Sequence, residues 1–424
     1  MKRSFAPFRT TVFIALRQLW ERKLLNGIAV GGVTLGVLVL IAMNGIMLGF
    51  REKFTSAILK ISPHVILFDT ELHPQAPLLQ RFAGTLVAAR VAHESPTDRQ
   101  TRIKRPYEIV HAMRAVAEID AAAPSLAGMA LLDFGGKTKS VDLRGIEVGA
   151  QDAVTPIHEY MKSGRLRDLE TSSDAIAIGS GIAQDLGLEV GDTVRAAAPG
   201  GKPLDLKVVA IFEAEVPPID KTRGYTTLRT AQTLLGRPDI ISRIEVRLKD
   251  PEDAIRVNDI LERMFGYDGE SWKESNANFL AIFAMQDMVV GFVIGAILLV
   301  GGFGILAIQI MIVLQKQRDI AILRSVGLRR ADILRIVLMQ GIIIALVGGV
   351  LGDVLGKVAI HYLGQLPVKA EGLVKSDTFL CHESPSFYVW GIVFALLVGI
   401  VASLIPAFRG SRVEPVEVLR GQLG

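Results

Sequence analysis

Hydrophobic positions gather in four long runs, separated by segments that are far richer in polar and charged residues. The runs cover residues 25–50, 288–314, 336–360 and 387–408. Each reaches the roughly 20 apolar residues that a helix needs to cross the hydrocarbon core of a bilayer. Because helices and closed barrels are the structures that satisfy their backbone groups in lipid, the pattern predicts four transmembrane helices.

The segment between the first two runs, residues 51–287, has another pattern. Short stretches with strand-like alternation or β-branched density are bounded by Gly, Pro and Asp, and stretches with helical spacing lie between them. Strands are predicted at 64–69, 175–179, 192–198, 206–212 and 243–248, and helices at 106–119, at the start of 179–192 and at 251–266. Residues 70–105, rich in Pro, His and Arg, are predicted to form a mobile insertion.

The expected fold class is therefore an α-helical membrane protein with four transmembrane helices and a large mixed α/β extracytoplasmic domain between helices 1 and 2. Composition agrees, since 50% of the 424 residues are hydrophobic and 21% are charged. The mean hydropathy of +0.39 is unusual for a wholly soluble protein of this length.

Lysine and arginine positions predict the orientation. Residues 1–24 hold six of them and one acid, and the loop 315–335 also holds six, whereas the loop 361–386 holds two. The positive-inside rule then places both termini, the loop 315–335 and the tail 409–424 in the cytoplasm. Residues 51–287 and 361–386 are expected on the opposite side.

The first run follows a basic segment, residues 1–24, which alternates apolar and basic residues. This pattern is typical of a helix in the cytoplasmic interface, and equally of a snorkelling flank of the first span. The run itself is longer than the apolar part of a signal peptide, so an uncleaved anchor is expected.

Each candidate catalytic or cofactor-binding motif lacks a residue that it requires. "GGKT" at 135–138 would need a glycine where Leu131 stands to form a Walker motif, and "HEYMK" at 158–162 has Lys162 where zinc hydrolases have a second histidine. "GSG" at 179–181 lacks the frame of a serine hydrolase. The single cysteine, Cys381, excludes an intramolecular disulfide, and the net charge of +4 comes largely from the flanks of the spans. We expect no catalysis, no metal or cofactor bound by this chain, and no nucleic acid partner.

Glycines recur every fourth residue in the spans, at 27 and 31, 32 and 36, 291 and 295, and 348, 352 and 356. Such repeats let helix backbones approach closely in lipid. They suit packing within the chain or an interface with a second subunit.

Sequence motifs at both ends resemble one family. The stretch "QKQRDIAILRSVGLRRADILRIVLMQGIIIALVGGVLG" (315–352) resembles the permease signature of FtsX-like, MacB-like and LolC/LolE transporters, and 405–422 resembles their C-terminal end. "IALRQLWERK", "MNG" (43–45) and "ILKISPHV" (58–65) look most like the lipoprotein-releasing LolC/LolE branch. "LRGIEVG", "AIGSGIAQDLGLEVGDTV" and "VVAIF" look like a MacB-type external domain.

The resemblance implies a permease subunit of an ATP-driven ABC transporter in a bacterial inner membrane. It would release lipoproteins for transfer to the outer membrane, by passing on force from a separate cytoplasmic ATPase dimer that binds ATP and Mg²⁺. The other implied partners are a second permease copy or paralogue, the lipoprotein or other envelope cargo, and a periplasmic carrier or adaptor. A MacB-like efflux permease for drugs or peptides, and an FtsX-like regulator of a cell-wall hydrolase, are the alternatives.

The resemblance also implies two sites. The charged segment between spans 2 and 3 would be a coupling helix, with Ile320 and Leu323 as apolar anchors for the ATPase. The full set comprises Lys316, Arg318, Asp319, Ile320, Leu323, Arg324 and Gly327, with Gly327 ending the helix. The alternative is an interfacial helix that only turns the chain. Cargo acyl chains would rest against Met43, Met47, Phe50, Phe54, Met285 and Met288, residues that could instead simply pack or touch lipid.

Overall fold

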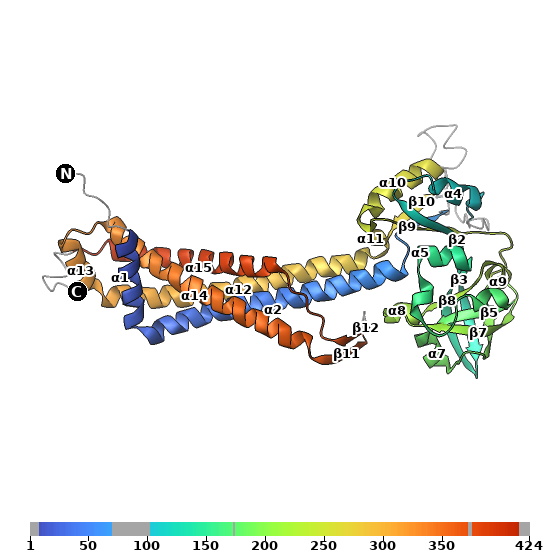
Figure 1. Cartoon of the computed structure of the whole chain (residues 1–424), viewed down its shortest axis with the longest axis horizontal. Coiled ribbons are helices and arrows are strands. Elements are labelled where there is room, and N and C mark those ends of the chain that lie inside the picture. The colour runs from blue at the N-terminus through green and yellow to red at the C-terminus, as the bar shows by residue number, and fades with distance from the viewer. Residues whose placement is uncertain (1–7, 70–101, 173, 372–374, 415–424) are drawn as a thin grey trace, which may run out of the picture. The chain divides into compact units, whose positions relative to one another are not determined.

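The computed structural model describes residues 8–69, 102–172, 174–371 and 375–414 (Figure 1). The chain divides into two compact units. Unit 1 contains the residues up to 52, 281–368 and those from 377 onward, and unit 2 contains 53–280 and 369–376.

The described residues contain four helices that are long and apolar enough to cross a membrane. They are α2 (Lys23–Ile61), α12 (Ala277–Gln315), α14 (Arg330–Gly364) and α15 (Pro385–Ser411). Two shorter helices accompany them, α1 (Phe8–Glu21) and α13 (Gln317–Ser325). A two-stranded sheet of β11 (Pro367–Glu371) and β12 (Lys375–Thr378) lies between α14 and α15 in sequence.

Two of these helices extend past the predicted spans. The first predicted span ends at residue 50, but α2 continues to Ile61; the second begins at residue 288, but α12 already starts at Ala277. Residues 51–61 contain neither Gly nor Pro. Nothing in that stretch therefore ends a helix where the apolar run stops.

The glycine repeat of α14 packs against α2. A Cβ placed on Gly352 would lie 2.6 Å from the Val37 Cβ, and one on Gly348 would lie 2.7 Å from the Val33 Cβ. Gly356 meets Ile41 in the same way. This repeat therefore serves packing within the chain. In contrast, a Cβ on Gly27, Gly31, Gly291 or Gly295 would meet nothing within 4 Å.

Helices α2 and α12 lie side by side and antiparallel (Figure 1). Near one end, a Cβ on Gly32 would lie 3.8 Å from the Gly301 Cα. Near the other, the rings of Phe50 and Phe283 meet edge to face with centroids 5.9 Å apart. Helices α14 and α15 also run together, because Gly341 of α14 leaves room for Ser403 of α15.

Unit 2 is built on a ten-stranded mixed sheet in the order β10-β1-β9-β2-β3-β8-β5-β7-β4, with β6 pairing with both β2 and β7. The β3–β8 and β5–β7 pairs are parallel. The strands are β1 (Val65–Phe68), β2 (Ile119–Phe134), β3 (Lys137–Ile146), β4 (Met161–Gly164), β5 (Ala175–Gly179), β6 (Thr193–Ala197), β7 (Leu204–Phe212), β8 (Arg223–Thr227), β9 (Arg243–Leu248) and β10 (Asp268–Ser271).

The helices of unit 2 are short. They are α4 (Pro106–Met113), α5 (Val148–Val154), α6 (Asp168–Thr171), α7 (Ser180–Leu186), α8 (Pro217–Asp220), α9 (Leu228–Leu234), α10 (Ala254–Phe265) and α11 (Trp272–Ser275), with 3-10 turns at Ile157–Tyr160 and Pro251–Asp253. Two hydrophobic cores result. One lies around Leu126, Leu143 and Ile176, and the other around Leu67, Val246 and Trp272.

All five predicted strands are confirmed, at β1, β5, β6, β7 and β9, within two residues at either end. The predicted helix over 106–119 was wrong at its C-terminal end, because α4 stops at Met113 and Ile119 already begins β2. The predicted helix over 251–266 is a 3-10 turn followed by α10. Most of the predicted insertion, residues 70–101, lies outside the described residues.

Candidate functional site

The segment that resembles the family signature forms α13, a separate short helix between two long ones. Lys316 is its N-cap. At its C-terminus the Gly327 N–H donates to the Arg324 carbonyl (3.1 Å) and the Leu328 N–H donates to the Leu323 carbonyl (3.2 Å). Gly327 has a φ of 116°, a conformation that favours glycine. This paired pattern is the Schellman motif, which ends the helix sharply.

The structure places the apolar centre of α13 inward. Ile320 is 5% exposed and packs with Ile333, Ile336 and Val337 of α14, while Leu323 is half-buried beside the same cluster. These two side chains hold α13 on its own chain. The predicted role of Ile320 as an anchor reaching into a partner does not fit this burial.

The opposite face of α13 carries two apolar side chains that the sequence reasoning missed. Ile322 is 46% exposed and Val326, one turn later, is 78% exposed. Arg318 and Asp319 are exposed on the same helix. The spacing of four between Ile322 and Val326 is the signal that could have identified this face.

Two of the predicted coupling cations are engaged within the chain. The Lys316 Nζ pairs with the Glu21 carboxylate at the end of α1, and this hydrogen bond holds the pKa of that carboxyl below its usual value. The Arg324 guanidinium donates to the Val413 carbonyl just after α15. The two ends of α13 are therefore tied to α1 and to the segment that follows α15.

Helix α1 is itself anchored on α14. Its Gln18 Oε1 accepts a hydrogen bond from the Gln340 Nε2 at 2.6 Å. The other face of α1 exposes Phe13, Leu16 and Trp20. Such an outward apolar face suits a helix at a membrane interface, which is one of the two roles considered for residues 1–24.

The predicted cargo-lining residues do not form one surface. Met47 lines a cavity of about 100 Å³ between α2, α12 and α15, and Phe50 contacts Phe283 of the same cavity. Phe54 is 3% exposed, with its ring 5.2 Å from that of Phe279, so it does not present a lining surface. Met43 is half-buried and Met285 and Met288 are exposed, outside the residues that line this cavity.

The cavity is more polar than the predicted lining. Asn44, Gln286, Arg51 and Asp287 also line it, and the last two form an ion pair at 3.5 Å. Asn44 donates its amide to the Leu40 carbonyl at 2.8 Å. The site can therefore hold an apolar group next to polar ones.

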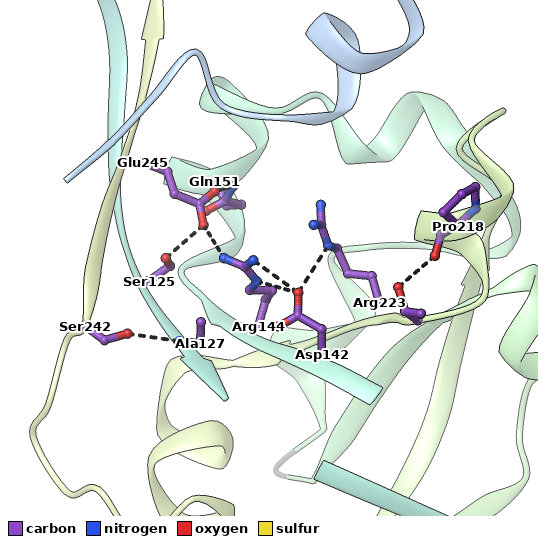
Figure 2. Close-up of polar contacts among 10 residues, drawn as sticks. Ser125, Ala127, Asp142, Arg144, Gln151, Pro218, Arg223, Ser242 and Glu245 are labelled. Atoms are coloured by element: carbon purple, nitrogen blue, oxygen red, sulfur yellow. Dashed lines mark hydrogen bonds and ion pairs between the residues drawn. The ribbon is translucent and has the colours of Figure 1, made fainter. Parts of the chain in front are cut away.

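Unit 2 contains a cluster of polar side chains from the adjacent strands β9, β2 and β3 and from α5 (Figure 2). The Glu245 carboxylate on β9 is 5% exposed and accepts hydrogen bonds from Ser125 Oγ (2.9 Å) and Gln151 Nε2 (2.7 Å). It also lies 3.4 Å from the Arg144 guanidinium of β3, which in turn bonds Asp142. Removing one partner from such a buried, hydrogen-bonded charge cluster is costly, so the cluster fits a structural role.

Comparison with known proteins gives two family matches. The model of the MacB-like periplasmic core domain matches residues 27–264, and the model of the FtsX-like permease C-terminal region matches residues 291–415. Together they extend over most of the chain.

Three relatives match nearly the whole of this chain. A lipoprotein-releasing system transmembrane protein LolC from Xylella fastidiosa is 27% identical over 413 residues, covering 92% of this chain and 92% of that protein. A LolE protein of the same system from Haemophilus influenzae is 25% identical, again covering 92% of both chains. A macrolide export ATP-binding/permease protein MacB from Agrobacterium fabrum is 22% identical, covering 95% of this chain and 59% of that protein.

Proposed function

Because this chain belongs to the superfamily of ABC transporter permeases with a MacB-like periplasmic core domain and an FtsX-like permease region, we propose that it releases lipoproteins from an inner membrane for transfer to the outer membrane. ATP would be hydrolysed by a separate cytoplasmic ATPase dimer. The lipoprotein assignment is supported by the LolC and LolE relatives, which match the chain over nearly its whole length.

The proposed coupling to the ATPase is supported mainly by the exposed face of α13. Ile322 and Val326 offer two apolar contacts, and Arg318 and Asp319 offer charged contacts beside them. A partner groove that buries a few apolar side chains within a polar rim is a common recognition mode for a helix. We propose that the ATPase provides such a groove for α13.

Rigid connections would carry motion away from α13. Lys316 ties one end of α13 to α1, and Arg324 ties the other end to Val413, which follows α15. Helix α1 is joined to α14 through Gln18, and α14 is packed closely on α2 through Gly352. When ATP binding moves α13, the long helices would move with it.

Cargo would contact the far ends of these helices, where Met47, Asn44 and the Arg51–Asp287 pair line one cavity. An apolar side chain beside polar groups suits the junction between the acyl chains and the polar backbone of a lipid-anchored protein. Following the positive-inside rule, we place both termini and α13 in the cytoplasm and unit 2 in the periplasm. A second permease subunit and a soluble periplasmic carrier would complete the pathway.

The test is a release assay with the complete permease–ATPase complex in proteoliposomes that contain a fluorescent acylated lipoprotein. ATP should move the lipoprotein into the soluble fraction, given a carrier protein to accept it. Val326→Asp should reduce both release and permease-stimulated ATP turnover to background, since it places a charge in the proposed contact. Thr10→Asp, an equal charge on an exposed position of α1, is the matched control and should leave both unchanged.

Different results separate the alternatives. ATP turnover that responds to the permease while every lipoprotein stays in the bilayer would contradict lipoprotein release. Movement of a drug or peptide in the same vesicles would then favour a MacB-like efflux permease. Activation of a cell-wall hydrolase without movement of any cargo would favour an FtsX-like regulator.

A further inference from the structure

Two cavities follow one another along the seam between α12 and α15. The first has a volume of about 390 Å³ and is lined by apolar side chains such as Leu299, Phe303, Leu397 and Val401. It contains no charged residue, and much of its lining is exposed, including Val401 at 56%. A surface of this kind suits a hydrocarbon chain.

The second cavity has a volume of about 310 Å³ and lies at the end of the same seam nearest α13. Its floor is apolar, but Gln317, Arg409 and Arg412 also line it. The two arginines are exposed. Within the part of the chain that the structure describes, neither guanidinium forms an ion pair or a side-chain hydrogen bond.

The two cavities adjoin along the seam, and we refer to them together as the groove. Leu306 of the first and Ile310 of the second are one turn apart on α12, and Ile405 and Pro406 are neighbours on α15. From Leu397 to Arg409 the helix rises roughly 18 Å, at about 1.5 Å per residue. This length is close to half of the roughly 30 Å hydrocarbon core, which is the depth of one leaflet.

We propose that this groove is a binding site for an anionic phospholipid, with an acyl chain along Leu397–Ile405 and the headgroup phosphate at Arg409 and Arg412. Arginine forks match phosphate oxygens, and basic pockets between transmembrane helices recognise anionic headgroups. A zwitterionic phospholipid such as phosphatidylcholine also offers a phosphate, but its choline cation would lie near the two arginines, so a headgroup with net negative charge is favoured. A free phosphate would leave the apolar half of the groove empty.

The bound lipid would touch the elements that hold α13. Gln317 is the first residue of α13, and Val413 accepts the hydrogen bond from Arg324. Both residues line the headgroup cavity. The anionic lipid would thus fill the space beside the coupling helix. The site itself does not depend on the proposed cargo. With α13 in the cytoplasm, as proposed above, the headgroup would lie in the cytoplasmic leaflet.

Native mass spectrometry of the full detergent-solubilised chain tests this site, by titration with phosphatidylglycerol and with phosphatidylcholine of the same acyl chains. We expect phosphatidylglycerol to bind on the order of tenfold more tightly, and the double variant Arg409→Ala/Arg412→Ala to lose this preference. Val401→Trp, which fills the apolar half and keeps both charges, should weaken phosphatidylglycerol binding as well.

Matched controls remove the same charge or add the same bulk elsewhere. Arg9→Ala/Arg17→Ala removes two exposed arginines of α1, and Val354→Trp adds an indole at an exposed position of α14. Both should bind the two lipids as the unaltered protein does. Unfolding temperatures, measured for every variant, check that each is folded.

Three results would overturn the proposal. The first is equal binding of the two lipids by the unaltered protein, and the second is an unchanged preference in the double arginine variant. The third is efficient disulfide formation between Val401→Cys copies in a Cys381→Ser background, which would assign the groove to a second copy of this chain. None of these readouts involves ATP or cargo, so they are independent of the release assay.

Discussion

Lys316, the N-cap of α13, forms an ion pair with Glu21, the last residue of α1. The Lys316 side chain is only 13% exposed, so the pair is partly shielded from solvent. It joins the helix proposed to contact the ATPase to a helix that is itself bonded to α14 through Gln18. The pair therefore connects the proposed site of force input to a long helix.

Reversing one charge of this pair should weaken coupling. Lys316→Glu places two carboxylates together, and we expect permease-stimulated ATP turnover to fall roughly two- to fivefold, since such a pair contributes up to about 1 kcal/mol. The double variant Lys316→Glu/Glu21→Lys restores opposite charges and should recover most of the turnover. A double variant no better than the single one would show that the pair does not transmit force.

The close contact between α14 and α2 should not tolerate a side chain at Gly352. Gly352→Ala places a Cβ 2.6 Å from the Val37 Cβ, so the helices must separate. We expect a loss of about 1–3 kcal/mol in stability, seen as a lower unfolding temperature in detergent. Gly295→Ala is the control, because its Cβ meets nothing within 4 Å. Equal effects of the two variants would contradict the packing.

Stability of unit 2 should depend on pH through His64. Its ring is 5% exposed and its Nδ1 accepts a hydrogen bond from the Leu248 N–H at 3.0 Å. Burial, and then the nearby Arg247, lowers the pKa of His64 below its usual value. Below pH 6.5 the unfolded chain takes up a proton that the folded ring resists, so stability is full above pH 6.5 and declines as the pH falls.

Thermal unfolding of the full chain between pH 7.5 and 5.0 measures this effect. The loss should reach at most about 1.4 kcal/mol per pH unit below 6.5. His64→Gln cannot take up the proton and should show a shallower pH dependence, whatever its starting stability. The same slope in both proteins would assign the pH dependence to other groups.

The buried carboxylate of Glu245 should be important for the stability of unit 2. Glu245→Ala leaves the Arg144 guanidinium and the Gln151 amide without their shared partner, and we expect a loss of about 3–5 kcal/mol in stability. Glu252→Ala, which removes an exposed carboxylate paired with Lys273, should cost less than about 1 kcal/mol. Limited proteolysis of the full chain would report both effects, and similar digestion rates would contradict the role of Glu245.

The apolar helices could be predicted because twenty consecutive apolar residues have few other structures available in lipid. Strands such as Arg243–Leu248 were predictable for a similar reason, since their β-branched residues alternate. In contrast, β2 contains the alanine-rich stretch "IDAAAPSLAGMALLDF", with a proline and a glycine, which has little intrinsic preference for a strand. Its conformation comes from pairing with β3 on one side and β9 on the other, which local sequence does not reveal.

The orientation of α13 could not be predicted from the sequence for a related reason. The run from Ile320 to Leu323 is apolar on every side, so composition could not distinguish the face that packs on α14 from the face that remains exposed. Likewise, the local sequence does not reveal that Arg324 and Lys316 have partners within the chain. Their partners, the Val413 carbonyl and Glu21, lie far away in the chain.

In the proposed mechanism, α13 receives force on one side of a bilayer and unit 2 acts on the other. Substituted-cysteine labelling tests it directly, with Val326→Cys on α13 and Met129→Cys on β2, both exposed, in a Cys381→Ser background. In spheroplasts, a membrane-impermeant maleimide should label Met129→Cys at once and Val326→Cys only after lysis. Labelling of both positions under the same condition would place them in one compartment and contradict the account.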